Sequence, residues 1–253
     1  MWKMINILIL MAGKNEHFNE EQYPFPRPLI EIGQKTIIEL VIQNLSTVGK
    51  DIEFIFVLSA SECKKYHLDT TLNIITNKKC KIVYVNNATK GAACSALLAV
   101  KHIKNDCPLI IANSDQLFDD SIQLLLSELK NADAGVVTFD SVHPRWSYAR
   151  TNERGEVVET MEKHPISRNA IAGMYYFKRG EDFIDATMQS ILKNSTVNGN
   201  YYIAPALNEM ILNGKNIKSV KVENKKYHTL YSPQKIKEYE EHVNKVKIIN
   251  SNE

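Results

Sequence analysis

Short apolar runs alternate with amphipathic segments through the first half of the 253-residue chain. Continuous apolar runs are typical of strands buried on both faces, and the segments between them have helical spacing of apolar side chains. We predict strands at residues 5–11, 52–59, 80–85 and 108–115, and helices at residues 36–48, 60–67, 91–103 and 119–130. Thr36 and Glu39 fit a capping box at the start of the first helix. The alternation predicts a parallel sheet joined by crossover helices.

The second half of the chain is less regular and contains a hairpin pattern. We predict strands at residues 134–141, 170–180 and 217–222, a hairpin over residues 146–162 that turns near Gly155, and helices at residues 181–193, 201–213 and from residue 233. The expected fold class is α/β with one mixed, mainly parallel sheet. We expect a single domain over residues 1–248, with halves at 1–130 and 131–248, and a frayed tail at residues 249–253.

The charge balance excludes several classes of partner. Lys and Arg number 31 and Asp and Glu number 29, so the net charge is only +2. A field this weak does not favour a general nucleic-acid or membrane-surface binder. The four cysteines lack metal-site spacing, and the apolar N-terminal stretch is too short to span a bilayer. We therefore expect a cytoplasmic protein with small-molecule partners and reduced thiols.

The loop after the first strand holds one glycine, Gly13, followed by Lys14 and His17. A dinucleotide fingerprint needs three spaced glycines, and a P-loop needs Gly-Lys-Ser or Gly-Lys-Thr, so both are excluded. The cations and the loop N–H groups suit a polyphosphate. A surface loop with incidental charges is the alternative.

Prolines surround the next cation, Arg27, which lies between Pro26 and Pro28 and shortly after Pro24. Prolines hold the segment extended, so that little backbone entropy is lost when Arg27 binds. Arginine makes bidentate contacts with phosphate. The functional interpretation is favoured over a connector whose arginine faces water.

Asp115 ends the apolar strand at residues 108–115. A buried charge needs a partner, so a metal ion or a hydrogen-bond donor is expected beside it. Mg²⁺ often uses only one or two carboxylates, with phosphates and water completing its shell. The alternative is that Asp115 caps a turn. Ligands of such sheets bind beyond the carboxyl ends of the strands, where Gly13 and Asp115 both fall.

Three further features have a structural alternative of equal or greater weight. Thr89 to Gly91 lie at a strand–helix junction, where small residues admit a flat base or simply pack. Glu162 and Lys163 follow the hairpin, as holders of a polar acceptor or as an exposed ion pair. Tyr201 and Tyr202 begin a helix, where aromatic packing is the stronger interpretation. The histidine spacing and the missing Gly-x-Ser-x-Gly motif do not support a hydrolase.

In combination, these stretches resemble the nucleotidyltransferases that make NDP-sugars and CDP-alcohols. That family has a strand followed by Ala-Gly-x-Gly-Ser/Thr-Arg and then Pro-Lys-Pro-Leu; here the matching stretches are LMAGKNEHF and FPRPLIEIG. The resemblance continues through TKGAACSAL, ANSDQLF, METMEKHPIS, AIAGMYYFKRG and NGNYYIAPALNEMI, in the family's order. It implies a Rossmann-like, three-layer α/β/α fold of the glycosyltransferase-A type.

The resemblance also implies roles for particular residues. The catalytic set would be Lys14, Arg27 and Asp115, with Asp115 binding Mg²⁺. The nucleotide would contact Met11, Ala12, Gly13, Lys14, Thr89, Gly91, Ala92 and Ser114, and the acceptor would contact Glu162, Lys163, Gly173, Tyr201 and Tyr202. The first half of the domain would bind nucleotide and the second half would bind acceptor. A homodimer is compatible with the pattern.

The chain also departs from the family pattern. Asn15, Glu16 and His17 replace the second loop glycine, the Ser or Thr and the arginine, and Thr229 stands where a second metal aspartate is often found. These changes put the phosphate geometry of the loop and the second metal ligand in question.

The resemblance implies that an NTP reacts with a phosphorylated acceptor and releases pyrophosphate. Its most specific form is similar to cytidylyltransferases of bacterial capsule modification, which implies CTP as the nucleotide and phosphoglutamine as the acceptor. Three alternatives stay open. They are a sugar-1-phosphate nucleotidyltransferase, a glycosyltransferase of similar fold, which usually carries Asp-x-Asp where this chain has Asn113-Ser114-Asp115, and a non-catalytic nucleotide-binding relative.

Overall fold

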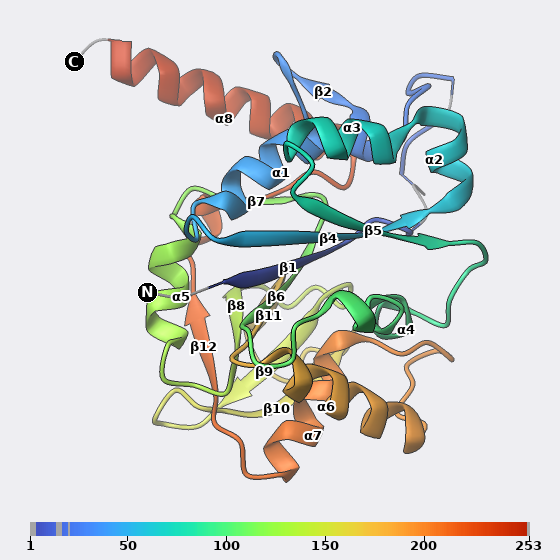
Figure 1. Ribbon diagram of the computed structural model, residues 1–253. Coiled ribbons are helices and arrows are strands. Elements are labelled where there is room, and N and C mark those ends of the chain that lie inside the picture. Colours follow the sequence, from blue (N-terminus) through green and yellow to red (C-terminus); the bar gives the residue numbers. More distant parts are fainter. Residues whose placement is uncertain (1–3, 14–16, 20, 252–253) are drawn as a thin grey trace.

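A nine-stranded mixed sheet forms the centre of the computed structural model, which describes residues 4–13, 17–19 and 21–251 (Figure 1). Four strands pair in parallel in the order β6, β1, β4, β5. Their bounds are β1 (Ile5–Leu10), β4 (Ile52–Ser59), β5 (Cys80–Val85) and β6 (Leu109–Asn113). The first half of the chain therefore builds the parallel sheet that its alternating pattern predicts.

The second half extends this sheet with mostly antiparallel strands. β11 (Asn169–Phe177) pairs antiparallel with β6 and with β8 (Ala134–Asp140). The predicted hairpin forms as β9 (Ser147–Thr151) and β10 (Val157–Glu162), and β12 (Ile217–Lys221) pairs parallel with β8. Two small ribbons lie outside the sheet: β2 (Glu31–Ile32) with β3 (Lys35–Thr36), and β7 (Gln116–Phe118) with β13 (Tyr227–Thr229).

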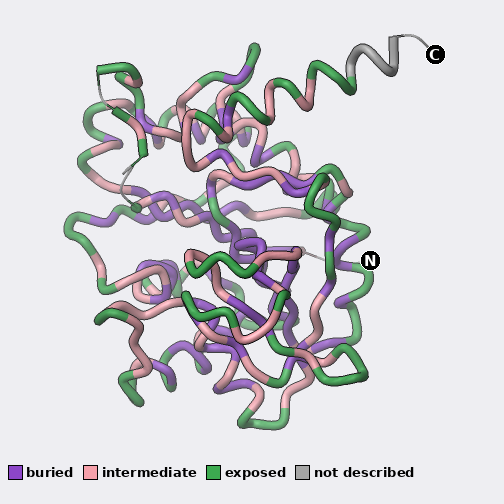
Figure 2. The backbone as a smooth tube through the Cα atoms, turned by 180° about the vertical axis from the view of Figure 1, so that it is seen from behind, coloured by how far each residue is buried: buried purple, intermediate pink, exposed green. Residues whose placement is uncertain are grey.

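Helices cover both faces of the sheet, which makes three layers. One apolar core joins Ile7 and Ile9 to α1 (Ile37–Ser46), α3 (Leu68–Ile75) and α5 (Ile122–Leu129). The other joins Leu8 to α4 (Ala92–Leu97), α6 (Gly180–Leu192) and α7 (Ile203–Leu212). Successive side chains of a strand point to opposite faces, so the continuous apolar run of β1 supplies both cores. Figure 2 shows buried positions concentrated in the strands and exposed positions along the outer helices.

The structure corrects two details of the predicted elements. The helix predicted at residues 91–103 is split into α4 and a 3₁₀ turn, η2 (Val100–His102), where the backbone hydrogen bonds span three residues, as from Ala99 N–H to Ala96 O at 3.0 Å and from His102 N–H to Ala99 O at 2.8 Å. The short helix predicted at residues 60–67 is confirmed as α2 (Ala60–Tyr66), but α3 follows it immediately and was not predicted. The last helix is α8 (Pro233–Ser251), and the fraying expected at residues 249–253 stays a prediction.

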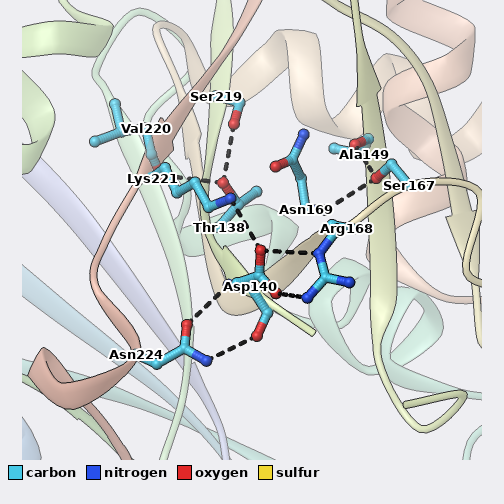
Figure 3. Close-up of polar contacts among 10 residues, drawn as sticks. All are labelled: Thr138, Asp140, Ala149, Ser167, Arg168, Asn169, Ser219, Val220, Lys221 and Asn224. Carbon is cyan, nitrogen blue, oxygen red and sulfur yellow. Dashed lines mark hydrogen bonds and ion pairs between the residues drawn. The ribbon is translucent and has the colours of Figure 1, made fainter. Parts of the chain in front are cut away.

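Asp140, at the end of β8, organises the approach to β13 (Figure 3). Its carboxylate accepts hydrogen bonds from Arg168 Nε at 3.1 Å and from Lys221 Nζ at 3.3 Å. Its backbone N–H and C=O pair with the Asn224 side chain at 3.0 and 2.8 Å. Chiefly because of the Arg168 hydrogen bond, the pKa of Asp140 lies below its usual range. The network fixes η3 (Asn224–Lys226), the turn that leads into β13.

None of the helices in the described ranges combines the length and apolar character that a bilayer crossing requires.

Candidate active site

Two adjoining cavities open at the carboxyl ends of β1 and β6, which are neighbours in the sheet. One cavity, which we call the Gly91 cavity, is lined in part by Arg27, Thr89 and Gly91 and has a volume of about 530 Å³. The other, the Glu162 cavity, is lined in part by Glu162, Lys163 and Gly173 and has a volume of about 330 Å³. The two cavities share Leu10, Ala92, Asn113, Asp115 and Tyr202 as lining residues. This is the edge at which the sequence predicts a site.

The proline-framed segment forms a 3₁₀ turn, η1 (Arg27–Leu29), that aims Arg27 at the common wall. Pro28 is buried within the turn, which ties the segment to the core. Arg27 Nη1 lies 3.1 Å from Asp115 Oδ2, and both side chains are more than four-fifths buried. Within the described ranges, Arg27 Nε is buried and makes no hydrogen bond. The arginine therefore has a fixed partner and an unused donor.

Asp115 lies in the tight connection between β6 and β7 and lines both cavities. Its backbone carbonyl accepts the N–H of Leu230 at 2.7 Å, which holds the end of β13 against it. Thr229, the last residue of β13, pairs with Gln116 of β7. Ser114 Oγ is buried and has no hydrogen-bond partner among the described residues.

Oxygen donors suited to a hard cation surround the Asp115 carboxylate. The amides of Asn113 and Gln116 and the hydroxyl of Thr229 line the Glu162 cavity beside it. This donor set fits Mg²⁺, which accepts one carboxylate and takes further ligands from phosphates and water. If position 229 corresponds to a second metal aspartate, as the resemblance implies, the neutral Thr229 would leave more of the shell to the substrate.

Gly91 is held in a conformation that only glycine tolerates here. Its φ is +102°, and an added Cβ would lie 2.2 Å from the Tyr201 carbonyl oxygen. The Tyr201 backbone brackets it, because the Tyr201 N–H donates to Lys90 O at 2.8 Å and its carbonyl accepts from Ala93 N at 3.1 Å. Thr89 Oγ1 donates to the Gly91 carbonyl at 3.1 Å, so Ser95 Oγ is the donor in the 2.6 Å bond between the two hydroxyls.

Glu162 and Lys163 do not form a simple exposed pair. Glu162 is buried and accepts a short hydrogen bond from the Ser147 hydroxyl. Burial is the largest effect on its pKa, which lies above its usual range despite that hydrogen bond and the nearby Lys163 charge. Lys163 Nζ donates to the Tyr202 hydroxyl at 3.0 Å, and its φ of 56° turns the chain away from β10.

Gly173 is a lining residue of the Glu162 cavity. It lies at a register shift in β11 with a φ of +64°, and an added Cβ would lie 2.1 Å from Gln116 Oε1 and 2.5 Å from Asn113 Nδ2. Glycine is needed both for the conformation and for the space.

Most of the predicted site residues line the cavities. Ala12, Gly13, Arg27, Thr89, Gly91, Ala92, Ser114 and Asp115 line the Gly91 cavity, while Glu162, Lys163, Gly173 and Tyr202 line the Glu162 cavity. Met11 is instead packed in a core, and the Tyr201 hydroxyl donates to Asn194 at 2.9 Å. Neither Met11 nor Tyr201 is a lining residue of these two cavities. Lys14 lies outside the described residues.

Sequence reasoning missed an aromatic and cationic wall of the Glu162 cavity. The Arg145 guanidinium lies 3.5 Å from the Tyr231 ring centroid and 5.0 Å from that of Trp146. The His17 ring meets the Tyr231 ring in a T-shaped arrangement, with 5.5 Å between the ring centroids. Pro144 precedes Arg145, as Pro26 precedes Arg27, so the Pro-Arg pair was the available signal.

Solved structures of pyrophosphorylases share this fold. A nucleoside-diphosphate-sugar pyrophosphorylase from Vibrio cholerae matches with a TM-score of 0.83 at 22% identity, over 93% of this chain and 99% of that one. An apo UDP-glucose pyrophosphorylase matches with a TM-score of 0.74 at 18% identity, over 96% and 99%. The Rossmann-like α/β fold predicted from the resemblance is confirmed.

Curated sequences give a second comparison. The bifunctional protein GlmU of Methanococcus aeolicus is 23% identical over 215 residues, which is 77% of this chain and 49% of that protein. The protein of the same name from Methanococcus maripaludis is 26% identical over 220 residues, 83% of this chain and 48% of that protein. The chain spans about half the length of these curated relatives.

The MobA-like NTP transferase domain matches residues 7–181, more than half of the chain. This range includes most of β1, the Arg27 turn, the Gly91 loop, Asp115, Glu162 and Gly173, so it covers much of the lining of both cavities. The chain belongs to the family of MobA-like NTP transferase domains.

Proposed function

We propose that this protein transfers a nucleotidyl group from an NTP to a phosphorylated small-molecule acceptor and releases pyrophosphate. The observation that carries the proposal is the position of Asp115. Its carboxylate lies on the wall common to two cavities and is paired with a buried arginine. A group at that junction can contact two substrates at the atoms where they react.

The Gly91 cavity suits the nucleotide. Its volume of about 530 Å³ is within the range of small-molecule sites, and Ala12, Gly13, Ala88 and Ala92 leave room for a base and ribose. Arg27 lies at the end where the phosphates would reach Asp115. All its lining residues except Asn200 and Tyr202 precede residue 130, which supports the proposed nucleotide-binding half.

The Glu162 cavity suits an acceptor that carries several charges. Arg145 and Lys163 offer cationic donors to a phosphate or a carboxylate, while Glu162 is a buried acceptor. Most of its lining residues follow residue 130, which supports the proposed acceptor-binding half.

The reaction needs no general base. An acceptor phosphate oxygen forms a bond to the α-phosphorus of the NTP, the bond from that phosphorus to the bridging oxygen breaks, and pyrophosphate leaves with the electron pair. The second pKa of a phosphate monoester is near 6, so the attacking oxygen is already deprotonated at neutral pH. The barrier is repulsion between polyanions, which alignment and charge neutralisation reduce.

The residues of this chain supply those two effects. Arg27 would hold the phosphates of the NTP, and Lys14 would join it, as the resemblance implies. Arg145 and Lys163 would hold the acceptor. Mg²⁺ on Asp115 would supply charge neutralisation between the two phosphates when bound.

For the specific substrates we propose CTP and phosphoglutamine, giving CDP-glutamine for a bacterial capsule or surface polysaccharide. The support is the charge pattern, because an amino-acid phosphate brings an ammonium group for Glu162 and a carboxylate for Arg145. A sugar 1-phosphate is the second candidate, since the structural neighbours are named as sugar-nucleotide pyrophosphorylases and the amides of Asn113 and Gln116 suit hydroxyl groups equally well.

One experiment tests the reaction and ranks the substrates. The protein is incubated with Mg²⁺, each of the four NTPs plus dTTP, and a panel of phosphoglutamine and sugar 1-phosphates, and pyrophosphate release is measured. Acceptor-dependent release supports nucleotidyl transfer, and the best pair identifies the substrates. Release from no pair, with NTP binding retained, would support a non-catalytic relative. Consumption of an NDP-sugar without an NTP would support a glycosyltransferase.

A further inference from the structure

We propose that Asp119, His228 and His242 form a second divalent-metal site, of the zinc class, that fastens α8 to the β7–β13 ribbon. Each residue offers one ligand atom, and these atoms all lie within 4.8 Å of one another. The site is separate from the substrate cavities, and the proposal does not depend on the proposed function.

The three proposed ligand side chains already lie close to one another. His228 Nε2 lies 2.9 Å from Asp119 Oδ1, and His242 Nε2 lies 3.2 Å from Asp119 Oδ2. The two imidazole rings are 4.4 Å apart between centroids. A zinc ion bound tetrahedrally at roughly 2.0–2.1 Å separates its ligand atoms by about 3.3 Å. Small side-chain movements would therefore bring the three atoms into coordination.

The ligand types select the class of metal. Two imidazoles and one carboxylate suit zinc and its neighbours among the transition metals, whereas Mg²⁺ prefers oxygen ligands. Zinc takes imidazole in its neutral form and releases a proton when a protonated histidine becomes a ligand, so Zn²⁺ binding here should weaken as the pH falls. The nearby Lys226 ammonium pairs with Asp120 at 3.0 Å and does not occupy the site.

The three ligands come from three segments that are far apart in sequence. Asp119 follows β7, His228 lies in β13, and His242 lies on α8. The Asp119 N–H donates to Lys226 O at 2.9 Å, and Tyr239 packs its ring 5.2 Å from that of His228. The first two ligands are thus held by the ribbon, while His242 is the single ligand from the helix.

A metal ion at this point would hold α8 against the β7–β13 ribbon. Figure 1 shows α8 extending from the body toward the C-terminus. Ile236 is its buried anchor near the start, and among the side chains described from residue 240 onward none is fully buried. Among the described side chains of α8, apolar packing is therefore concentrated in the first turns, and a metal bound by His242 would hold the helix further along.

The same ribbon carries residues of the candidate site. Gln116 and Thr229 line the Glu162 cavity, while His228 directly precedes Thr229 in β13 and Asp119 directly follows the end of β7. None of Asp119, His228 and His242 is a lining residue of either cavity. A metal at the second site would stiffen the wall that holds Thr229 without touching substrate.

The test uses untagged, chelator-treated full-length protein titrated with Zn²⁺ by calorimetry and with Co²⁺ by visible absorption. We expect one saturable site and the intense visible bands of tetrahedral Co²⁺. His242→Ala and Asp119→Asn should each weaken Zn²⁺ binding by at least roughly tenfold. His102→Ala, which removes a histidine elsewhere, should leave binding unchanged. Because His242 is partly exposed on a helix surface, its replacement should not impair folding.

Thermal stability and hydrogen exchange report whether the metal holds α8 to the ribbon. At a Zn²⁺ concentration near 100 times its Kd, the Tm should rise by roughly 5–10 °C in the wild type and not in His242→Ala. Hydrogen exchange in α8 should slow on adding Zn²⁺. Equal Zn²⁺ affinity in wild type, His242→Ala and Asp119→Asn would overturn the proposal, as would the absence of saturable binding or an unchanged Tm at saturation. An excess of Mg²⁺ should not displace the bound metal, and displacement would also overturn it.

Discussion

Arg27 Nη1 lies 3.1 Å from Asp115 Oδ2, across the junction of the two cavities. The sequence predicts both residues for one site, with Asp115 paired either to a metal or to a donor, and the structure gives it the donor. The pair neutralises two charges that are both largely buried. Substrate phosphates and a cation would offer each member a new partner, so the pair holds the site in order before they bind.

Arg27→Ala and Asp115→Ala should each lower kcat/KM by roughly 10²-fold or more, the scale of losing one preorganised charge contact. Each variant also leaves a buried charge without its partner, so the free energy of unfolding should fall by about 3–5 kcal/mol. Steady-state pyrophosphate release and denaturant unfolding measure the two effects.

The double variant distinguishes coupled from independent roles. Because each residue is the other's partner, the combined loss of stability should be smaller than the sum of the two single losses. Arg179→Ala, which removes an exposed arginine from its ion pair with Asp182 at the start of α6, is the control and should keep near-normal kcat/KM. Near-normal turnover in Arg27→Ala or Asp115→Ala would contradict the assignment.

The site could be predicted where local sequence alone constrains a residue. Arg27 was evident from its prolines, Asp115 from its position at a strand end, and the Glu162–Lys163 pair from its place after a hairpin. Arg145 and Tyr231 were not evident, because residues 86 positions apart meet only through the ribbon that β13 forms with β7. Tyr201 contributes through its backbone, which a side-chain pattern does not reveal.

The fold, like the site, could be predicted where the local sequence constrains an element. The parallel strands β1, β4, β5 and β6 are mostly apolar, interrupted near their starts by Asn6, Glu53 and Lys81 in the first three. The Thr36–Glu39 capping box forms as predicted, with Glu39 Oε2 accepting the Thr36 N–H at 2.6 Å. The helix at residues 68–75 was missed because Leu68 and Leu72 are its two buried side chains, too few to give a clear stripe. The order of β11 and β8 in the sheet depends on long-range pairing that no local pattern encodes.

Gly173→Ala should damage the acceptor site beyond its backbone strain. The new Cβ would clash with the side-chain amides of Gln116 and Asn113 and displace them. If these amides contact the acceptor with about 1.4 kcal/mol of binding free energy, the acceptor KM should rise roughly tenfold or more. Gly155→Ala is the control, because its φ is +75° and no atom lies within 4 Å of the added Cβ. It should cost about 1 kcal/mol of stability and leave KM unchanged. The same KM for both variants would show that the space at Gly173 is unimportant.

Tyr201→Phe and Tyr202→Phe should differ in what they change. The Tyr202 variant loses the hydrogen bond from Lys163 at 3.0 Å, which is one contact that positions this ammonium at the Glu162 cavity, so the acceptor KM should rise several-fold. Tyr201 loses only the bond to Asn194, so stability should fall by about 0.5–1.5 kcal/mol with KM preserved. Steady-state kinetics and thermal unfolding of both variants make the comparison, and a larger KM change in Tyr201→Phe would refute it.

Arg145→Ala should raise the acceptor KM by roughly 10- to 100-fold, the worth of a charged hydrogen bond to the acceptor. The KM for the NTP should change little, because Arg145 lines only the Glu162 cavity of the two. Arg145→Lys should give an intermediate KM, since lysine keeps the charge but stacks less well on Tyr231. Arg154→Ala in the exposed hairpin turn is the control. An equal rise in both substrate KM values for Arg145→Ala would place the residue elsewhere in the reaction.

Glu162→Gln should alter how stability depends on pH. Burial raises the folded-state pKa of Glu162 above its ordinary value of 4.5, more than the Ser147 hydrogen bond and the Lys163 charge lower it. Between the unfolded and folded pKa values the folded protein therefore binds more protons, so this group makes stability fall as the pH rises through that interval. Glutamine does not ionise and removes this dependence while it still accepts from Ser147. The free energy of unfolding of the wild type, relative to Glu162→Gln, should thus decrease on going from pH 4 to pH 7.

Chemical denaturation at several pH values measures this difference, with Glu153→Gln in the exposed turn as the control for loss of an unburied carboxylate. A wild-type advantage that grows with pH would mean that Glu162 is stabilised as the anion, and would reverse its assignment as a carboxyl disfavoured by burial.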